Sequence, residues 1–305
     1  MGQKDLAAKQ FERSPEVFAD IINAFIFDGE QLVFPGDLQP APTESLYPAA
    51  NGSLHNQYND VSKYEMRNGR ITMQYTLENQ STPDYKILLR KAGYEGAIYR
   101  QQYEGRDTFP AITLVLYWGE AVWNASVDLY QFFDGKKIHC KAGKYIDNVC
   151  LHMYSMGNLP QEIRQRFRSD MRVVVDYLAE REQYIPTEQS IVDLEATMRM
   201  LHALTGETNF IDHMHLLRKR QEEGGEITMG YAVSMYVERG KQEGRQEERI
   251  RSATAFVKET LMQKQSEEYI LRMLQTCFQL KEEEADNLYR KGYEMENKTE
   301  IHAFT

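Results

Sequence analysis

A helical repeat of apolar residues is the first clear pattern in the chain. Ser14 is a residue type preferred at a helix N-cap, and Pro15 suits the first helical position. Apolar side chains then recur at helical spacing over 17–25, and Gly29 ends the pattern, so a helix is predicted between these signals. Its other side carries a polar stripe, which consists of Glu16, Asp20 and Asn23.

Two Asn-Gly pairs predict a meander of three strands after this helix. Asn51-Gly52 is a strong two-residue hairpin signal, and it joins a strand near 44–49 to a second near 54–62. Asn68-Gly69 opens a third strand over 70–78, in which apolar and polar residues alternate. Period-two alternation gives the third strand one apolar face and one polar face.

A second helix and a buried strand complete an α/β pattern. Pro83 starts a helical stretch that runs to about 103, and 111–117 is a nearly continuous apolar run, typical of a strand buried on both faces. The order helix, three strands, helix, strand lets 111–117 lie parallel to 70–78 through a right-handed crossover. A further strand is expected at 148–155.

The pattern from Pro160 onward is helical. We therefore predict an α/β domain over 1–183 and an all-helical extension with a charged tail over 184–305. The expected helices cover about 161–182, 188–204, 209–221, 230–266 and, as an amphipathic pair, 266–292.

Composition narrows the class of protein. No apolar run approaches the length of a membrane span, the first sixteen residues lack the apolar stretch of a secretory signal, and the three cysteines are widely spaced, so we expect a cytoplasmic protein with no membrane partner. The net charge of −10 argues against a broad basic binding face. Residues 60–106 nevertheless carry eight Lys or Arg against six Asp or Glu.

The candidate chemistry lies at the ends of two predicted strands. Asp60 is near the end of the second strand, while Glu78 and Gln80 share one face at the end of the third. Two carboxylates at one sheet edge suit Mg²⁺, which binds through one or two carboxylates and keeps several waters. A solvated sheet face explains the same residues equally simply. No phosphate-loop or dinucleotide glycine pattern occurs, so no nucleotide cofactor is expected.

Several segments in this order carry a family resemblance: Tyr58-Asn-Asp-Val-Ser62, Leu77-Glu-Asn-Gln-Ser81, a helix with Leu89-Arg90 and Tyr94, and Ile112-Thr-Leu-Val-Leu-Tyr117. Together with Pro15–Asn23 they resemble the recombination-promoting nuclease/putative transposase family (YhgA-like). That family is a branch of the PD-(D/E)XK nuclease superfamily. The likeness covers roughly residues 5–180 and implies a restriction-endonuclease-like core.

The resemblance assigns roles to individual residues. Asp60 and Glu78 would be metal ligands for Mg²⁺ or Mn²⁺, and Gln80 would take the catalytic position that usually holds lysine. Asn59 departs from the superfamily pattern, which has proline before the aspartate. Glu16, or Asp20 nearly as well, is the candidate for an acid that many superfamily members add to the metal site from the first helix.

A DNA endonuclease linked to recombination or a mobile element is the activity that the resemblance implies. Lys86 and Arg90 lie one helical turn apart and could contact DNA phosphates, although a solvated helix face explains them too. Cutting both strands of a duplex requires two catalytic centres, so the sequence leaves a homodimer open. The alternative hypothesis, favoured by the acidic charge and the missing lysine, is a DNA- or partner-binding module that keeps the nuclease fold without turnover.

Overall fold

A mixed five-stranded sheet forms the centre of the computed structural model, which describes residues 3–48, 54–58, 60–103, 105, 108–133 and 140–303. The strand order is β1-β4-β5-β6-β7, antiparallel from β1 to β5 and parallel from β5 to β7. This arrangement confirms the α/β class, the parallel crossover and the strand expected near 148–155. The strands are β1 (Leu38–Pro40), β4 (Val61–Arg67), β5 (Arg70–Gln80), β6 (Ala111–Tyr117) and β7 (His152–Ser155).

The meander differs in detail from the sequence prediction. The first hairpin, β2 (Glu44–Pro48) and β3 (Leu54–Tyr58), pairs as expected but forms a separate two-stranded sheet. Its Asn51-Gly52 turn lies outside the described residues. The predicted strand 54–62 is interrupted, so Asp60 occupies a bend directly before β4. The edge position of the main sheet goes instead to β1, where Pro40 is tolerated because an edge strand need not donate on both sides.

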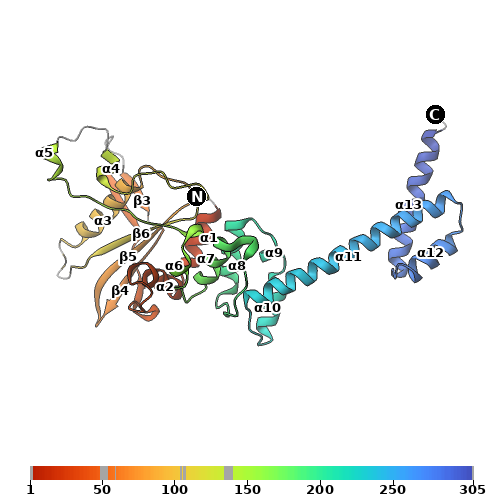
Figure 1. The fold of residues 1–305 in the computed structure, drawn as a ribbon, viewed down its shortest axis with the longest axis horizontal. Helices are drawn as coiled ribbons and strands as arrows, with labels where there is room; N and C mark the ends of the chain where they lie inside the picture. Colours follow the sequence, from red (N-terminus) through yellow and green to blue (C-terminus); the bar gives the residue numbers. More distant parts are fainter. Residues whose placement is uncertain are drawn as a thin grey trace. The chain divides into compact units, whose positions relative to one another are not determined.

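Helices cover both faces of the sheet (Figure 1). On one side, α1 (Gln3–Glu12) packs on β5, and α2 (Pro15–Ile26) packs on α7 (Met171–Glu180). Ser14 caps α2 through its hydroxyl, as the sequence predicts. On the other side, α3 (Ile87–Gln101) packs on β6 around a core of Ile87, Leu88, Val115 and Leu151.

The polar face of β5 is buried from Gln74 to Glu78. Gln74, Thr76 and Glu78 are each 2% exposed or less, as are the apolar residues on the opposite face, Tyr75 and Leu77. The Gln74 side-chain amide donates to Ser62 Oγ at 2.9 Å, and Ser62 Oγ lies 3.0 Å from Thr76 Oγ1. The polar face that the alternation predicts is therefore buried over residues 74–78, where its side chains form internal hydrogen bonds.

From residue 161 onward the helices follow the predicted positions with different boundaries, whereas the short helices within 35–37, 129–133, 140–143 and 156–158 are not predicted. The helix expected over 161–182 is divided into α6 (Gln161–Arg164) and α7. The others are η1 (Pro35–Asp37), α4 (Leu129–Phe133), α5 (Cys140–Gly143), η2 (Met156–Asn158), η3 (Arg181–Gln183), α8 (Leu194–Thr205), α9 (Asn209–Asp212), α10 (Met214–Glu222), α11 (Met229–Met262), α12 (Glu267–Thr276) and α13 (Glu282–Ala303). None of these described helices has the combined length and apolarity that crossing a bilayer requires.

The chain divides into two compact units, 1–232 and 233–305. Within the first unit, α8 packs against α1, so the helices over 184–232 belong with the sheet rather than with the helices that follow. The second unit has its own apolar core, to which α12 contributes Ile270 and Leu274.

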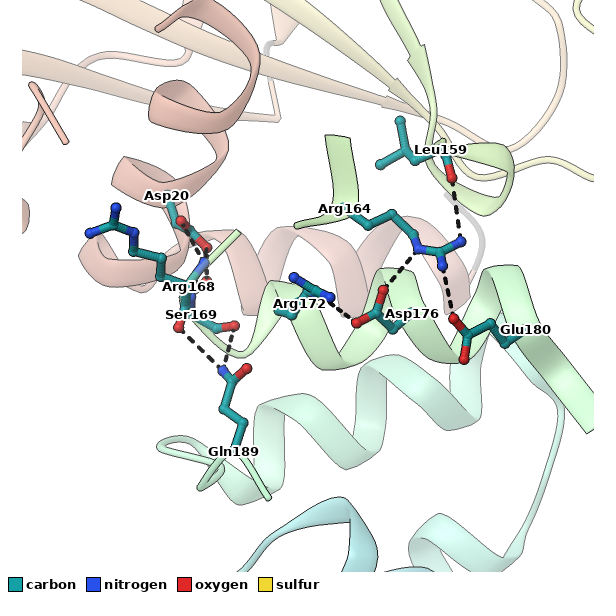
Figure 2. A network of polar contacts seen from close by, with 9 residues as sticks. All are labelled: Asp20, Leu159, Arg164, Arg168, Ser169, Arg172, Asp176, Glu180 and Gln189. Atoms are coloured by element: carbon teal, nitrogen blue, oxygen red, sulfur yellow. Dashed lines mark hydrogen bonds and ion pairs between the residues drawn. The ribbon is translucent and has the colours of Figure 1, made fainter. Parts of the chain in front are cut away.

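Buried carboxylates hold the turn before α7 (Figure 2). Asp20 of α2 accepts hydrogen bonds from the backbone N–H of Arg168 at 2.9 Å and of Ser169 at 2.8 Å, and from the Ser169 hydroxyl at 2.7 Å. Close by, Arg164 Nε donates to Asp176 Oδ1 at 2.8 Å, and Arg172 also pairs with Asp176. Asp176 is 5% exposed, so these bonds replace nearly all of its hydration.

The Asp176 network yields a stability prediction. Asp176→Ala removes the buried carboxylate that pairs with both Arg164 and Arg172 and leaves Arg164 with the partly exposed Glu180, so we expect the free energy of unfolding to fall by about 3 kcal/mol. Glu195→Ala is the matched control, because Glu195 also pairs with two arginines but is 45% exposed, and we expect a loss below about 1 kcal/mol. Urea unfolding followed by circular dichroism measures both. Equal losses in the two variants would contradict the role given to Asp176.

Candidate metal-binding site

The two carboxylates singled out from the sequence meet where β4 begins and β5 ends. Val61 is paired with Leu77 in the antiparallel register, so continuing the register by one step sets Asp60 opposite Glu78. Directly opposed residues of antiparallel strands point to the same side of the sheet. The geometry therefore brings these two acids to one rim, although Asp60 itself lies in the bend outside the strand.

The side chain of Asp60 is fixed from two directions. Its Oδ2 accepts a hydrogen bond from the backbone N–H of Asn79 at 2.7 Å, which continues the strand pairing through a side chain. Its Oδ1 lies 2.6 Å from Nζ of Lys9 on α1. Asp60 is thus held between the end of β5 and the first helix.

Glu78 is 2% exposed and stands between opposing charges. Its Oε1 pairs with the guanidinium of Arg90 from α3, while its Oε2 is buried and has no hydrogen-bond partner. Burial and the negative charge of Asp60 raise the pKa of Glu78 to about 8, against the opposing effects of Arg90 and Lys9.

The side chain of Asn79 lies on the opposite face of β5 and fixes the end of this strand. Its side-chain amide donates to Glu12 Oε2 at 2.7 Å, and its Oδ1 accepts from Trp118 Nε1 at 2.6 Å. Glu12 is completely buried, its Oε1 has no partner, and burial is the main cause that raises its pKa well above the ordinary value. The charge of Asp60 also raises this pKa, and Asn79 links the two acids, since its side chain contacts Glu12 and its backbone N–H contacts Asp60.

Lys9, Glu12 and Trp118 are residues of this site that sequence reasoning does not find. The helix α1 lacks a clear apolar stripe, so no helix is predicted before Ser14. The one available signal is the spacing of Lys9 and Glu12, which at i and i+3 share a helix face.

The structure places the predicted acids of the first helix elsewhere. Glu16 accepts a hydrogen bond from Ser14 Oγ at 2.8 Å, and its charge acts on Lys63. Asp20 binds the backbone at 168–169 and has a structural role there. Glu12, one helix earlier than the predicted acids, shares Asn79 with Asp60.

Gln80 and the two basic candidates also have defined positions. Gln80 shares the face of Glu78 by strand alternation. Its backbone carbonyl accepts a hydrogen bond from the Trp118 backbone N–H at 2.8 Å. Lys86 is exposed at the N-cap of α3. The guanidinium of Arg90 is engaged inside the protein, with Glu78 and with Asp84 Oδ2 at 2.9 Å.

The donor set suits a hard divalent cation. Oxygen atoms of Glu78 and Glu12 are buried without hydrogen-bond partners, an arrangement that a polar ligand would relieve. Among the side chains that the structure describes, no three or more His, Cys, Asp or Glu residues form a ready cluster around one cation. A site with two carboxylates, completed by water and a substrate phosphate, is the kind that Mg²⁺ prefers.

These observations define an α/β protein with a carboxylate pair at the rim of a mixed sheet. The family described as "Putative transposase, YhgA-like" matches residues 50–211, more than half of the chain, and the chain belongs to this family. The match includes Asp60, Glu78 and Gln80 and extends through α8, but it does not reach Lys9 or Glu12. No curated protein and no solved structure matches the chain.

The raised pKa of Glu78 yields a pH prediction for the metal-free protein. Between pH 4.5 and about 8 the folded state keeps a proton on Glu78 that the unfolded state releases, so stability falls as pH rises through this range. Glu78→Gln cannot titrate. We therefore expect the variant to gain stability relative to the unmodified protein as pH rises from 5 to about 8, in urea unfolding with EDTA present.

Glu195→Gln is the control, because the pKa of Glu195 is lowered by its arginine partners and its carboxylate stays charged above pH 5. A stability difference for Glu78→Gln that does not change with pH would mean that Glu78 is ionised throughout.

Proposed function

We propose that this protein is a Mg²⁺-dependent DNA endonuclease of the PD-(D/E)XK type that serves recombination or a mobile element. The observation that carries the proposal is the meeting of Asp60 and Glu78 at one sheet rim, with a buried Glu78 oxygen left unpaired. Membership of the transposase-like family supports a role in DNA processing. The element order α2, β4, β5, α3, β6 supports a restriction-endonuclease-like core.

In this proposal the chain's own residues hold and orient the reactants. Asp60 and Glu78 would hold the ion, either Mg²⁺ or Mn²⁺, through their carboxylates. When bound, the ion supplies Lewis acidity, which makes a water easier to deprotonate and neutralises charge on the phosphate. The Asn79 N–H holds Asp60 in place, and Arg90 holds Oε1 of Glu78.

The substrate is the phosphodiester backbone of DNA. Gln80 orients the attacking water through its side-chain amide. Water adds to phosphorus, the bond from phosphorus to the 3′ oxygen breaks, and that oxygen takes a proton, which leaves a 5′-phosphate and a 3′-hydroxyl. Exposed Lys86, at the N-cap of α3, contacts a neighbouring phosphate and positions the strand.

Metal titration distinguishes the nuclease from the alternative, a DNA- or partner-binding module without turnover. Calorimetry with Mn²⁺ should detect an ion whose binding is lost in Glu78→Ala. If the protein binds DNA but shows no Mn²⁺ binding that depends on Glu78, the module is the better account.

The nuclease proposal predicts metal-dependent cleavage. Purified protein should nick supercoiled plasmid with Mg²⁺ or Mn²⁺ and stop when EDTA is added, and Asp60→Ala should reduce nicking to background because the ion loses a ligand. Asp212→Ala is the control, since Asp212 is an exposed acid of α9 and should leave the rate unchanged. Equal cleavage by Asp60→Ala and the unmodified protein would exclude this site.

A separate prediction concerns Lys86. Lys86→Ala removes a phosphate contact, so DNA affinity should weaken similarly for all sequences and the slope of log affinity against log salt should drop by about 1. Fluorescence anisotropy with labelled duplex at several salt concentrations, with Ca²⁺ in place of Mg²⁺, measures this slope. An unchanged slope would remove Lys86 from the DNA interface.

A further inference from the structure

A lysine from the first helix faces the carboxylates of the candidate site. Lys9 Nζ lies 2.6 Å from Asp60 Oδ1, and the two side chains are only 14% and 12% exposed. The charge of Lys9 also lowers the pKa of Glu78 and of Glu12. One ammonium group therefore acts on three acids of the site at once.

The strand itself supplies no cation at this position. Gln80, which shares the face of Glu78, ends in a neutral amide. A phosphodiester brings one negative charge to a rim that already holds Asp60 and Glu78, and more charge develops on the phosphate oxygens during cleavage. Fixed positive charge placed where negative charge develops is a large contribution to catalysis.

Arg90 is poorly placed to supply this positive charge. Its guanidinium pairs with Glu78, with Asp84 Oδ2 at 2.9 Å and with the Tyr94 hydroxyl at 3.2 Å. These partners neutralise its charge and hold it on the α3 side of the sheet. Lys9 approaches from the α1 side, with its Nζ 2.6 Å from Asp60 Oδ1.

The fold holds Lys9 in this position through the rest of α1. Ala8 and Phe11 are 1% exposed or less, and α1 packs on both β5 and α8. Glu12, one turn further along, is tied to Asn79 at 2.7 Å. A carboxylate oxygen accepts more than one partner, so Asp60 Oδ1 can keep Lys9 while it binds an ion.

We propose that Lys9 supplies the positive charge that the neutral side chain of Gln80 does not, and that it acts as a positioning residue for Asp60 and the phosphate. This inference rests on the proposed nuclease function. It assigns to α1, which lies outside the family match, a direct part in the site.

The test compares variants of the full chain in two assays, single-turnover plasmid nicking with Mg²⁺ and Mn²⁺ binding by calorimetry. Lys9→Met should lower the nicking rate about 10²–10³-fold, the usual cost of removing one charge-stabilising group. Mn²⁺ should bind at least as tightly as before, because a repelling cation has been removed. Lys4→Met, on the same helix, is the control and should match the unmodified protein.

A second substitution tests the role of the charge itself. Lys9→Met combined with Gln80→Lys restores a cation at the rim and should recover at least tenfold of the lost rate. Lys9→Arg keeps the charge and should stay within about tenfold of the unmodified protein, which provides a test if Lys9→Met does not fold.

Three results would overturn the inference: nicking by folded Lys9→Met within threefold of normal, loss of Mn²⁺ binding together with nicking in that variant, or no recovery in the double variant. The first leaves Lys9 without a role, and the second makes it a support of the ion site alone. If the unmodified protein neither nicks DNA nor binds Mn²⁺, the proposed function itself fails, which is a different result from any of these.

Discussion

The hydrogen bond from the Asn79 backbone N–H to Asp60 Oδ2 is the contact on which the candidate site depends. Asp60 lies in a bend before β4, where strand pairing no longer fixes the backbone. Its carboxylate nevertheless accepts from the end of β5 at 2.7 Å, so the side chain continues the pairing that the backbone has left. Without this bond, nothing in the strand register would hold Asp60 opposite Glu78.

Asn79 can hold that position because its own side chain is fixed. Glu12 accepts from the amide group and Trp118 donates to the amide oxygen, which ties α1, β5 and the end of β6 to the same residue. The contact to Lys9 adds a second link from α1 to Asp60. The rim is therefore assembled from segments that are distant in sequence, and its geometry depends on the packing of α1 as much as on the sheet.

Burying these acids opposes folding. Glu78 and Glu12 both have raised pKa values, chiefly through burial, and each has an oxygen without a partner. Stability alone would favour an amide or an apolar side chain at either position. Such arrangements concentrate at functional sites, where a bound ion or substrate provides the missing partner.

The sequence predicts the elements whose patterns are local. Ser14 and Pro15 mark the start of α2, Asn68-Gly69 marks the turn into β5, and the apolar run 111–117 identifies a central strand. Asn68 and Gly69 both adopt positive φ, which explains why this residue pair forms that turn. The sequence also singles out Asp60 and Glu78, although it assigns Asp60 to the end of a strand. The two acids meet because the antiparallel register sets the start of β4 beside the end of β5.

What the sequence does not predict depends on long-range packing. The weak pattern of α1 conceals Lys9 and Glu12, and the bend at Asp60 cannot be distinguished from a continuous strand over 54–62. The polar stripe of α2 suggests a metal ligand in Glu16 or Asp20. Asp20 is instead fixed by the backbone of residues 168 and 169, a contact across 148 positions that no local pattern encodes.

The most direct test of the central claim is the position of a bound ion. Crystals grown with Mn²⁺ give an anomalous scattering peak at any site that binds it. Our account predicts a peak at coordination distance, about 2.0–2.3 Å, from both Asp60 Oδ1 and Glu78 Oε2. A peak bound by other residues, or well-ordered Asp60 and Glu78 side chains with no peak between them at saturating Mn²⁺, would contradict it.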